Sequence, residues 1–431
     1  MNLLSRIRRL FILIIIRLTR IPLYLENLGE TSIWSWSWAI TLLSYIRVIF
    51  VTYTGAQSFG QRHKNWNSLI IAGLLTRLLI CFNSDNMLVF YVFFELRALI
   101  IFLIVLRLGY QPERLEARLY LLLFTVFTSL PFFALILYLG ERRGITVFLR
   151  ARLAPLRGLS EINRVVSVIL VLGFLTKFPM YFVHIWLPKA HVEASTTGSI
   201  LLAGILLKLG RFGLFRVICL LRVTPLINYI SFFALLGGAL ISIFCVRITD
   251  LKILVAYSSV AHMSLVLRGI LTITQLGQLG GLRIRVAHGV TSSALFFGVG
   301  TFYSWSNSRL YLLNSGYFIW APRFAFFWFI FCCRNMGTPP AFNFWSELIL
   351  IFSIVGNEVL TLGVLAIALF FAVAFNIIIY IRSQRQKEVS QLTYSLNFNL
   401  KEQRIFLLHL VWLLRLTFFF DIFFKYGENT F

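Results

Sequence analysis

Long apolar runs are the feature of this sequence that most restricts its fold. They recur along the whole of the 431 residues, and short polar connections separate them. Each run is about 20 residues long, which as an α-helix matches the hydrocarbon core of a bilayer. The lipid interior offers no water to the backbone, so each run must satisfy its own hydrogen bonds as a helix. We therefore predict an all-α, multi-pass membrane protein.

The composition agrees with a membrane protein, because only 13% of the residues are charged and 59% are hydrophobic. A soluble domain is nearer one quarter charged. No connection is long enough for a soluble domain, so one transmembrane domain is expected to fill residues 1–431. The predicted spans lie at 8–24, 33–53, 68–83, 87–108, 116–140, 165–187, 197–221, 225–247, 251–273, 284–304, 323–336, 342–381 (long enough for two) and 404–424.

Several classes of function lack support in this sequence. The net charge of +24 comes largely from basic residues that flank apolar runs, as in membrane proteins generally, so we expect no nucleic-acid binding. The phosphate-binding and dinucleotide-binding glycine motifs are absent. We therefore expect that this chain binds no nucleotide directly and contains no cofactor. The cysteines show no metal-ligand spacing and are interpreted as small apolar residues: Cys81, Cys219, Cys245, Cys332 and Cys333.

Two of the apolar runs are interrupted in a similar way. One contains a lysine two residues before a proline, at Lys177 and Pro179. The other contains the segment GTPPAFNFWSEL, Gly337 to Leu348. Paired interruptions that carry ionisable residues are typical of transporters with inverted repeats and broken helices.

Four ionisable residues lie within or at the edge of apolar runs: Glu95, Lys177, Lys208 and Glu347. A charge in the membrane is costly, so such residues usually pair, titrate or line a hydrated path. Burial disfavours the charged form of a lysine, and a nearby carboxylate favours it. A lysine between these two influences can bind and release a proton. The alternatives are a buried pair that only orders the bundle and, for Glu347, a side chain that reaches the interface.

Histidines are candidates for intermediate proton-transfer steps, because their unperturbed pKa is about 6.5. His184 follows Lys177 by seven residues and would share its helical face if Pro179 did not interrupt the helix. His262 and His288 lie among small hydroxyl residues that can hold water. Each could instead make only a helix-packing hydrogen bond. Three further polar residues are expected in the loop and at the start of the next helix: Lys189, His191 and Glu193.

Several long motifs together resemble one family. They are LVLGFLTKFPMYFVHIWLPKAHVEASTTGSILLAGILLKLGRFGLFR, LVAYSSVAHMSLV, VAHGVTSSALFF and GTPPAFNFWSEL, with FELRALIIFLIVLRLGYQPERLEARLYLLLFT upstream. The sequence resembles chain 4 of mitochondrial NADH:ubiquinone oxidoreductase, an antiporter-like subunit of respiratory complex I. The motifs cover residues 85–350, and the two ends match in hydropathy only.

The resemblance implies a bundle of 13–14 transmembrane helices with two inverted repeats. Residues 1–84 would form N-terminal helices, 85–221 the first repeat, 225–381 the second, and 382–431 a C-terminal loop and helix. It also implies a mitochondrial inner-membrane location, other complex I membrane subunits and lipids as partners, and proton translocation in the respiratory chain, driven by electron transport to ubiquinone. The implied proton-relay residues are Glu95, Lys177, Lys208 and Glu347, with His184, His262 and His288 in the same motifs.

Many arginines depart from the family pattern, and each costs about 2.5–3.5 kcal/mol at the centre of a membrane helix. Some animal mitochondrial codes read AGA and AGG as serine or glycine, so we hypothesise that translation with another code created many of them. Arginine found by mass spectrometry at 211 and 268 of the native chain would contradict this. The family would have small or uncharged residues at Arg118, Arg211, Arg268, Arg283, Arg285 and Arg334.

Two other functions fit the same residues. A stand-alone cation/proton antiporter subunit would use the same lysines and glutamates, and sodium-driven transport by the isolated chain would identify it. A structural scaffold of a larger complex would need the charged pairs only to fix helix packing. Neutral replacement of Lys177 or Glu95 distinguishes a pump from a scaffold. A pump would assemble and lose activity, whereas a scaffold would fail to assemble.

Overall fold

The computed structural model describes residues 61–108, 114–143, 169, 171–218, 225–384 and 398–424. The predicted spans 8–24 and 33–53 lie outside these residues. The described residues form helices joined by short turns, and their β-structure is a single isolated bridge between Asp250 and Leu310. The prediction of an all-α helix bundle is confirmed.

Most predicted spans correspond to helices. The upstream helices are α3 (Gln61–Asn83), α4 (Met87–Leu108) and α5 (Arg114–Arg143), followed by α8 (Trp186–Glu193), α9 (Thr196–Leu201), the π-helical turn η2 (Leu202–Leu206) and α10 (Leu207–Ile218). The downstream helices are α11 (Pro225–Cys245), α12 (Leu251–Leu271), α13 (Gln275–Ser306), α14 (Tyr317–Trp320), α15 (Pro322–Met336), α16 (Phe342–Val355), the short 3₁₀ turn η3 (Val359–Thr361), α17 (Leu362–Gln384) and α18 (Leu400–Phe424).

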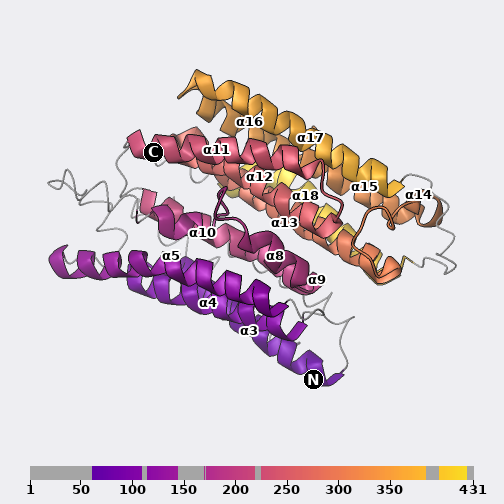
Figure 1. Cartoon of the computed structure of the whole chain (residues 1–431), viewed down its shortest axis with the longest axis horizontal. Helices are drawn as coiled ribbons and strands as arrows, with labels where there is room; N and C mark the ends of the chain where they lie inside the picture. The colour runs from indigo at the N-terminus through magenta and orange to yellow at the C-terminus, as the bar shows by residue number, and fades with distance from the viewer. Residues whose placement is uncertain are drawn as a thin grey trace.

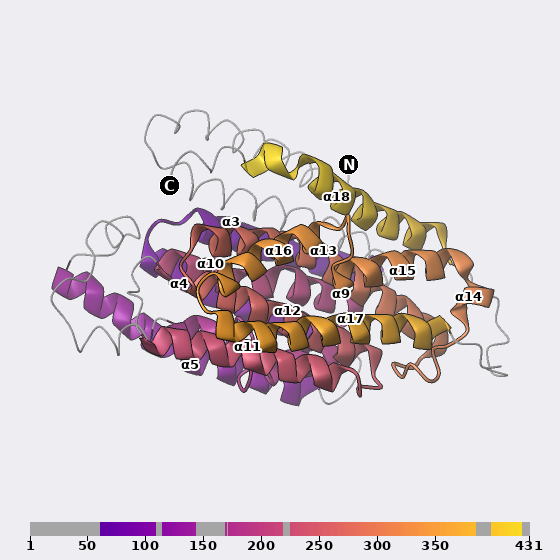
Figure 2. The same cartoon turned by 90° about the horizontal axis from the view of Figure 1, so that it is seen from above.

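The helices are arranged in layers that follow the chain (Figure 1). The helices α3, α4 and α5 form one side, α8 to α10 lie next to them, and α11 to α13 follow. The helices α15, α16 and α17 form the opposite side. Figure 2 shows α18 running along the outside of the bundle, where it packs mainly on α13. Six helical segments of the described residues are long and apolar enough to cross a membrane.

The boundaries differ from the predictions where packing overrides hydropathy. The run 342–381 divides into α16 and α17, as its length suggested. The helix predicted at 284–304 begins earlier, at Gln275, because its glycine-rich first turns are helical and closely packed. A Cβ atom on Gly277 would overlap the carbonyl oxygen of Gly269, and one on Gly280 would press on Leu350. Glycine here permits close helix contact, which hydropathy does not reveal.

The predicted span 165–187 is wrong as a single helix, because its helical part ends at Leu175 and a series of turns leads to α8. Pro179 has no N–H, so the carbonyl of Leu175 instead accepts a hydrogen bond from the N–H of Met180, at 3.4 Å. The carbonyl of Thr176 accepts one from the indole nitrogen of Trp186, at 2.9 Å. The interruption therefore satisfies these two backbone groups inside the bundle, as a membrane environment requires.

The second predicted interruption is present between α15 and α16. Gly337 ends α15 in the left-handed conformation, with φ +76°, which favours glycine. The N–H and the hydroxyl of Thr338 both donate to the carbonyl of Cys333, at 3.2 and 3.1 Å. Helix α16 then starts at Phe342. Both interruptions predicted from the sequence are confirmed, whereas the division of the chain into two repeats stays a prediction.

Candidate functional site

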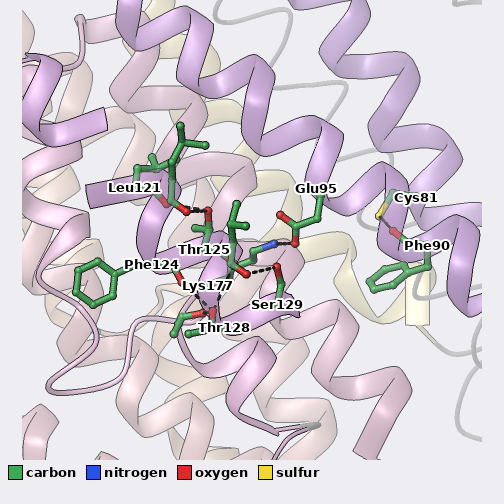
Figure 3. A network of polar contacts seen from close by, with 12 residues as sticks. Cys81, Phe90, Glu95, Leu121, Phe124, Thr125, Thr128, Ser129 and Lys177 are labelled. Atoms are coloured by element: carbon green, nitrogen blue, oxygen red, sulfur yellow. Dashed lines mark hydrogen bonds and ion pairs between the residues drawn. The ribbon is translucent and has the colours of Figure 1, made fainter. Parts of the chain in front are cut away.

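The structure joins Lys177 and Glu95 in an ion pair between the first interruption and α4 (Figure 3). The lysine follows directly on the helical segment that ends at Leu175, and its side chain is 1% exposed. The glutamate side chain is 19% exposed. The lysine Nζ also lies 3.6 Å from the centre of the Phe94 ring, which favours its charged form. The two residues that the resemblance implied as partners are therefore in direct contact.

Hydroxyl side chains of α5 approach the same interruption. The hydroxyls of Thr128 and Thr176 are 2.6 Å apart, and Thr176 is the residue before Lys177. Thr125 and Ser129 donate to carbonyls within α5, at 2.7 and 3.1 Å (Figure 3). Thr128 thus ties α5 to the residue before the lysine.

Lys208 lies next to the π-helical turn η2, at the second position of α10. Its side chain is 1% exposed, and its Nζ donates to the carbonyl of Ala203 at 2.6 Å. That carbonyl belongs to the turn, where the widened helix changes the normal hydrogen-bond pattern. The turn therefore gives a buried ammonium group a backbone partner inside the membrane domain.

Glu347 forms a second cluster with two histidines. The Nδ1 atom of His262 lies 3.4 Å from an oxygen of Glu347, and the rings of His262 and His288 are 5.1 Å apart between centres. The three side chains come from α16, α12 and α13, and each is 8% exposed or less. Helix α13 also packs on α9 and η2, so it links this cluster to the region of Lys208.

The second interruption positions the carboxylate of this cluster. A Cβ atom on Gly337 would lie 2.6 Å from an oxygen of Glu347, which is too close for any real side chain. The amide nitrogen of Asn343 donates to the carbonyl of Arg334 at 2.9 Å and ties α16 to the end of α15. The left-handed glycine thus makes room for the carboxylate.

His184 does not share a helical face with Lys177. The chain between them is non-helical, so the seven-residue spacing carries no face relation. The ring of His184 stacks on Tyr181, with 5.6 Å between centres and an angle of 18°, and meets Tyr257 edge-on. Its role as a relay residue stays a prediction.

The prediction for Lys189, His191 and Glu193 is partly wrong. All three belong to α8, an eight-residue helix of its own, and not to a loop. Lys189 is half-exposed and bonds to Glu116 of α5 at 2.9 Å. His191 and Glu193 are buried, at 1% and 6% exposure. The sequence reading failed because nothing in the sequence indicates that so short a helix lies inside the bundle, where six of its eight residues are buried.

The mid-helix arginines differ in their surroundings. Arg97 and Arg285 are almost fully buried, and guanidinium nitrogens of both have no hydrogen-bond partner among the described residues. Arg268 instead pairs with Glu358 at 2.5 Å and contacts the hydroxyl of Ser231. The side chains of Arg118 and Arg211 lie outside the described residues. A translation artefact would leave buried arginines without partners, which holds for Arg285 but not for Arg268. The translation hypothesis stays a hypothesis.

A search of protein families matches residues 84–375 to the membrane domain described as NADH:quinone oxidoreductase/Mrp antiporter. Two curated proteins named NADH-ubiquinone oxidoreductase chain 4 are also similar. The one from Ceratitis capitata is 38% identical and covers 86% of this chain and 83% of its own length. The one from Aedes aegypti is 39% identical and covers 74% and 71%. The chain belongs to the NADH-ubiquinone oxidoreductase chain 4 family. The resemblance noted in the motifs is confirmed.

Solved structures show the same fold. A chain of respiratory complex I from Thermus thermophilus matches with a TM-score of 0.83 at 23% identity, over 92% of this chain and 83% of that one. A chain of the Mrp complex from Dietzia matches with a TM-score of 0.79 at 20% identity, over 92% and 44%. Both are subunits of assemblies with further membrane chains. The likeness concerns the fold, and the roles of individual side chains in this chain stay predictions.

Some residues of these sites were not anticipated. Phe94 lies against the lysine of the first site, Trp186 bonds to its backbone, and Gly337 makes room for Glu347. The sequence did not single out Phe94 as a neighbour of the lysine, because this apolar run contains many aromatic residues. Gly337 had a usable signal, since it is the first residue of the motif that interrupts the helix.

Proposed function

We propose that this chain is a proton-translocating membrane subunit of respiratory complex I in the mitochondrial inner membrane. The observation that carries the proposal is the buried ion pair of Lys177 and Glu95 at an interrupted helix. Family membership supports the location and the partners, which would be the other membrane subunits of the complex and lipids. In this proposal the chain contributes no redox cofactor and binds no nucleotide, and the enzyme label belongs to the whole complex.

The mechanism follows from the electrostatics of the pair. While Glu95 is charged and adjacent, it stabilises the ammonium form of Lys177. If quinone reduction elsewhere neutralises or displaces this carboxylate, the lysine remains in a dry site without a counter-ion and releases its proton. The proton would then pass by way of Lys208 toward the cluster of His262, His288 and Glu347. Return of the carboxylate would reload the lysine.

The contacts of Lys208 and of the two histidines support this order of proton transfer. The ammonium group of Lys208 donates to a backbone carbonyl, so a change in the geometry of the turn η2 would alter its proton affinity. An imidazole can take a proton on one nitrogen while it releases one from the other. His262 and His288 are therefore suited to deliver a proton to Glu347, 3.4 Å from the first of them.

A stand-alone cation/proton antiporter subunit is the nearest alternative, and the likeness in fold to the Mrp chain favours it. The chain-4 relatives, at 38% and 39% identity, favour the complex I subunit. Sodium uptake driven by a pH gradient in vesicles that contain only this chain would support the antiporter.

The test is Lys177→Met in the assembled complex, reconstituted in vesicles with NADH and a quinone. We expect proton translocation per assembled complex to fall by about tenfold or more, because general acid–base groups contribute at least that much to proton transfer. The matched control is Lys189→Met, which removes an exposed lysine–glutamate pair near the same segment and should leave translocation unchanged. Loss of assembly with normal translocation in the complexes that remain would instead identify a scaffold.

A further inference from the structure

A small cavity lies at the junction of α8 and α9, on α12 and α13, outside the sites described above. Its volume is about 40 Å³, and its polar lining includes Glu193, Ser195, Thr196, Lys252, Tyr303 and Arg309. A buried water needs roughly 10–15 Å³ on this measure, so the cavity has room for about three water molecules. Much of its wall is apolar, but the charged and hydroxyl groups in it distinguish it from a wholly apolar void, which would stay dry.

Lys252 is the centre of charge in this cavity. Its Nζ donates to the carbonyls of Val192 and Ala194, at 2.8 and 2.6 Å, at the C-terminal end of α8. Glu193, between them in the sequence, is 6% exposed. Glu193, Asp250 and Arg309 all lie close enough to interact electrostatically with this lysine. The cavity thus brings a buried carboxylate and two cations together around space for water.

His191 connects this cavity to the interior of the bundle. It is 1% exposed, and neither ring nitrogen has a hydrogen-bond partner among the described residues. Its ring stacks on Phe296, with 4.4 Å between centres and an angle of 5°, and Phe296 forms part of the cavity wall. Two lysines act electrostatically on His191, namely Lys252 in the cavity lining and Lys208 of α10.

We propose that this cavity holds water and is the site where protons enter the chain on their way to Lys208. Glu193 exchanges a proton with the cavity water, and His191 accepts a proton on one ring nitrogen as it releases one from the other. The step moves a proton and changes no other bond. The inference rests on the proposed proton translocation and adds the point of uptake to it.

The arrangement exceeds what helix packing requires. The two bonds from Lys252 already fix the end of α8 on α12. A histidine that only filled space beside Phe296 would be replaced without cost by an apolar residue, since buried nitrogens without partners are unfavourable. Two unused nitrogens on a side chain that is 1% exposed are explained by proton transfer through transient contacts with water.

The first experiment measures proton translocation by the reconstituted complex between pH 6 and pH 8, with His191→Gln and Glu193→Gln. Protons are scarcer at pH 8, so loss of the uptake groups should slow translocation about tenfold there and clearly less at pH 6. Lys189→Met on the exposed side of α8 is the matched control. A loss that is equal at all pH values shows a structural role, and no loss at pH 8 also overturns the proposal.

The second experiment is a density map of the complex at a resolution that shows ordered water. Water molecules between Glu193 and Lys252 are expected, and a dry cavity overturns the proposal. This result is independent of Lys177→Met, which tests the proposed function itself. If Lys177→Met abolishes translocation while the cavity variants behave like the control, the uptake site is wrong and the pump stands.

Discussion

The two interrupted helices differ in the chemistry that they hold. At the first, Lys177 and Glu95 form a direct ion pair beside an aromatic ring. At the second, Glu347 faces His262 at 3.4 Å, and His288 lies behind. The first site therefore contains an ammonium group next to a carboxylate, and the second a carboxylate next to two imidazole rings.

This difference suggests different roles for the two interrupted helices in the proposed pump. A lysine paired with a carboxylate stays charged until the pair is disturbed, so the first site responds to the movement or neutralisation of Glu95. An imidazole needs no such disturbance to gain or lose a proton near neutral pH. In the proposed pump the first site would set the timing of proton release, and the second would conduct.

The largest expected effect is at the first site, with Glu95→Gln. This variant leaves the buried lysine without its counter-ion, and breaking a buried pair costs about 3–5 kcal/mol. We expect the complex still to assemble, in a lower amount on a native gel, and translocation per assembled complex to be lost in reconstituted vesicles.

The double variant Glu95→Gln, Lys177→Met separates stability from function. It removes both charges, so assembly should recover relative to the single Glu95→Gln variant while translocation stays lost. If translocation recovered together with assembly, the pair would have only a structural role, and the contrast between the two sites would disappear.

A smaller effect is expected at the second site, with His262→Gln. Glutamine is polar and of similar size but cannot carry a proton, so translocation should fall several-fold, with assembly unchanged. The measurement is the pH profile of translocation from pH 6 to pH 8. The shape of this profile should change in the variant, because the imidazole that carries the proton at this site is gone. An unchanged profile would contradict a conducting role.

The smallest effect is expected from Gly337→Ala. Alanine is strained at the φ of +76°, and its Cβ would press on the carboxylate of Glu347. We expect destabilisation of about 1–2 kcal/mol and a modest loss of translocation, measured by thermal unfolding and by reconstitution. The matched control is Gly363→Ala in α17, where a Cβ meets nothing within 4 Å. Equal effects of the two variants would show that Gly337 does not position the second site.

Hydropathy and motif spacing predicted the helix bundle, both interruptions and the membrane acids and bases. They did not predict that the turns continue from Thr176 to the start of α8, because the residues after Pro179 are mostly apolar and fit a helix as well. They also missed the early start of α13, since glycines there are chosen for close contact with α12 and α16. The burial of His191 depends on which side of a short helix faces the bundle.

The sequence also did not show that two arginines lie at the two interrupted-helix sites. Arg97 interacts electrostatically with both Lys177 and Glu95, so it adds a cation to the first site. Arg285 lies one helical turn before His288 at the second. Peptide masses that show serine or glycine at 97 and 285 would support the translation hypothesis and restore the simple contrast of the two sites. Arginine at both positions would mean that each site works beside an extra buried cation.

The π-helical turn η2 determines on which side of the helix Lys208 lies. A π turn accommodates one residue more than an α turn, and one residue corresponds to a rotation of about 100°. Everything after Leu206 is therefore turned by roughly that angle relative to an unbroken helix that starts with α9. A helical wheel drawn through this segment would place Lys208 on the wrong side. Deleting one residue between 202 and 206 would remove the extra residue of the turn, so an unbroken α-helix would hold the lysine on the side that it occupies now.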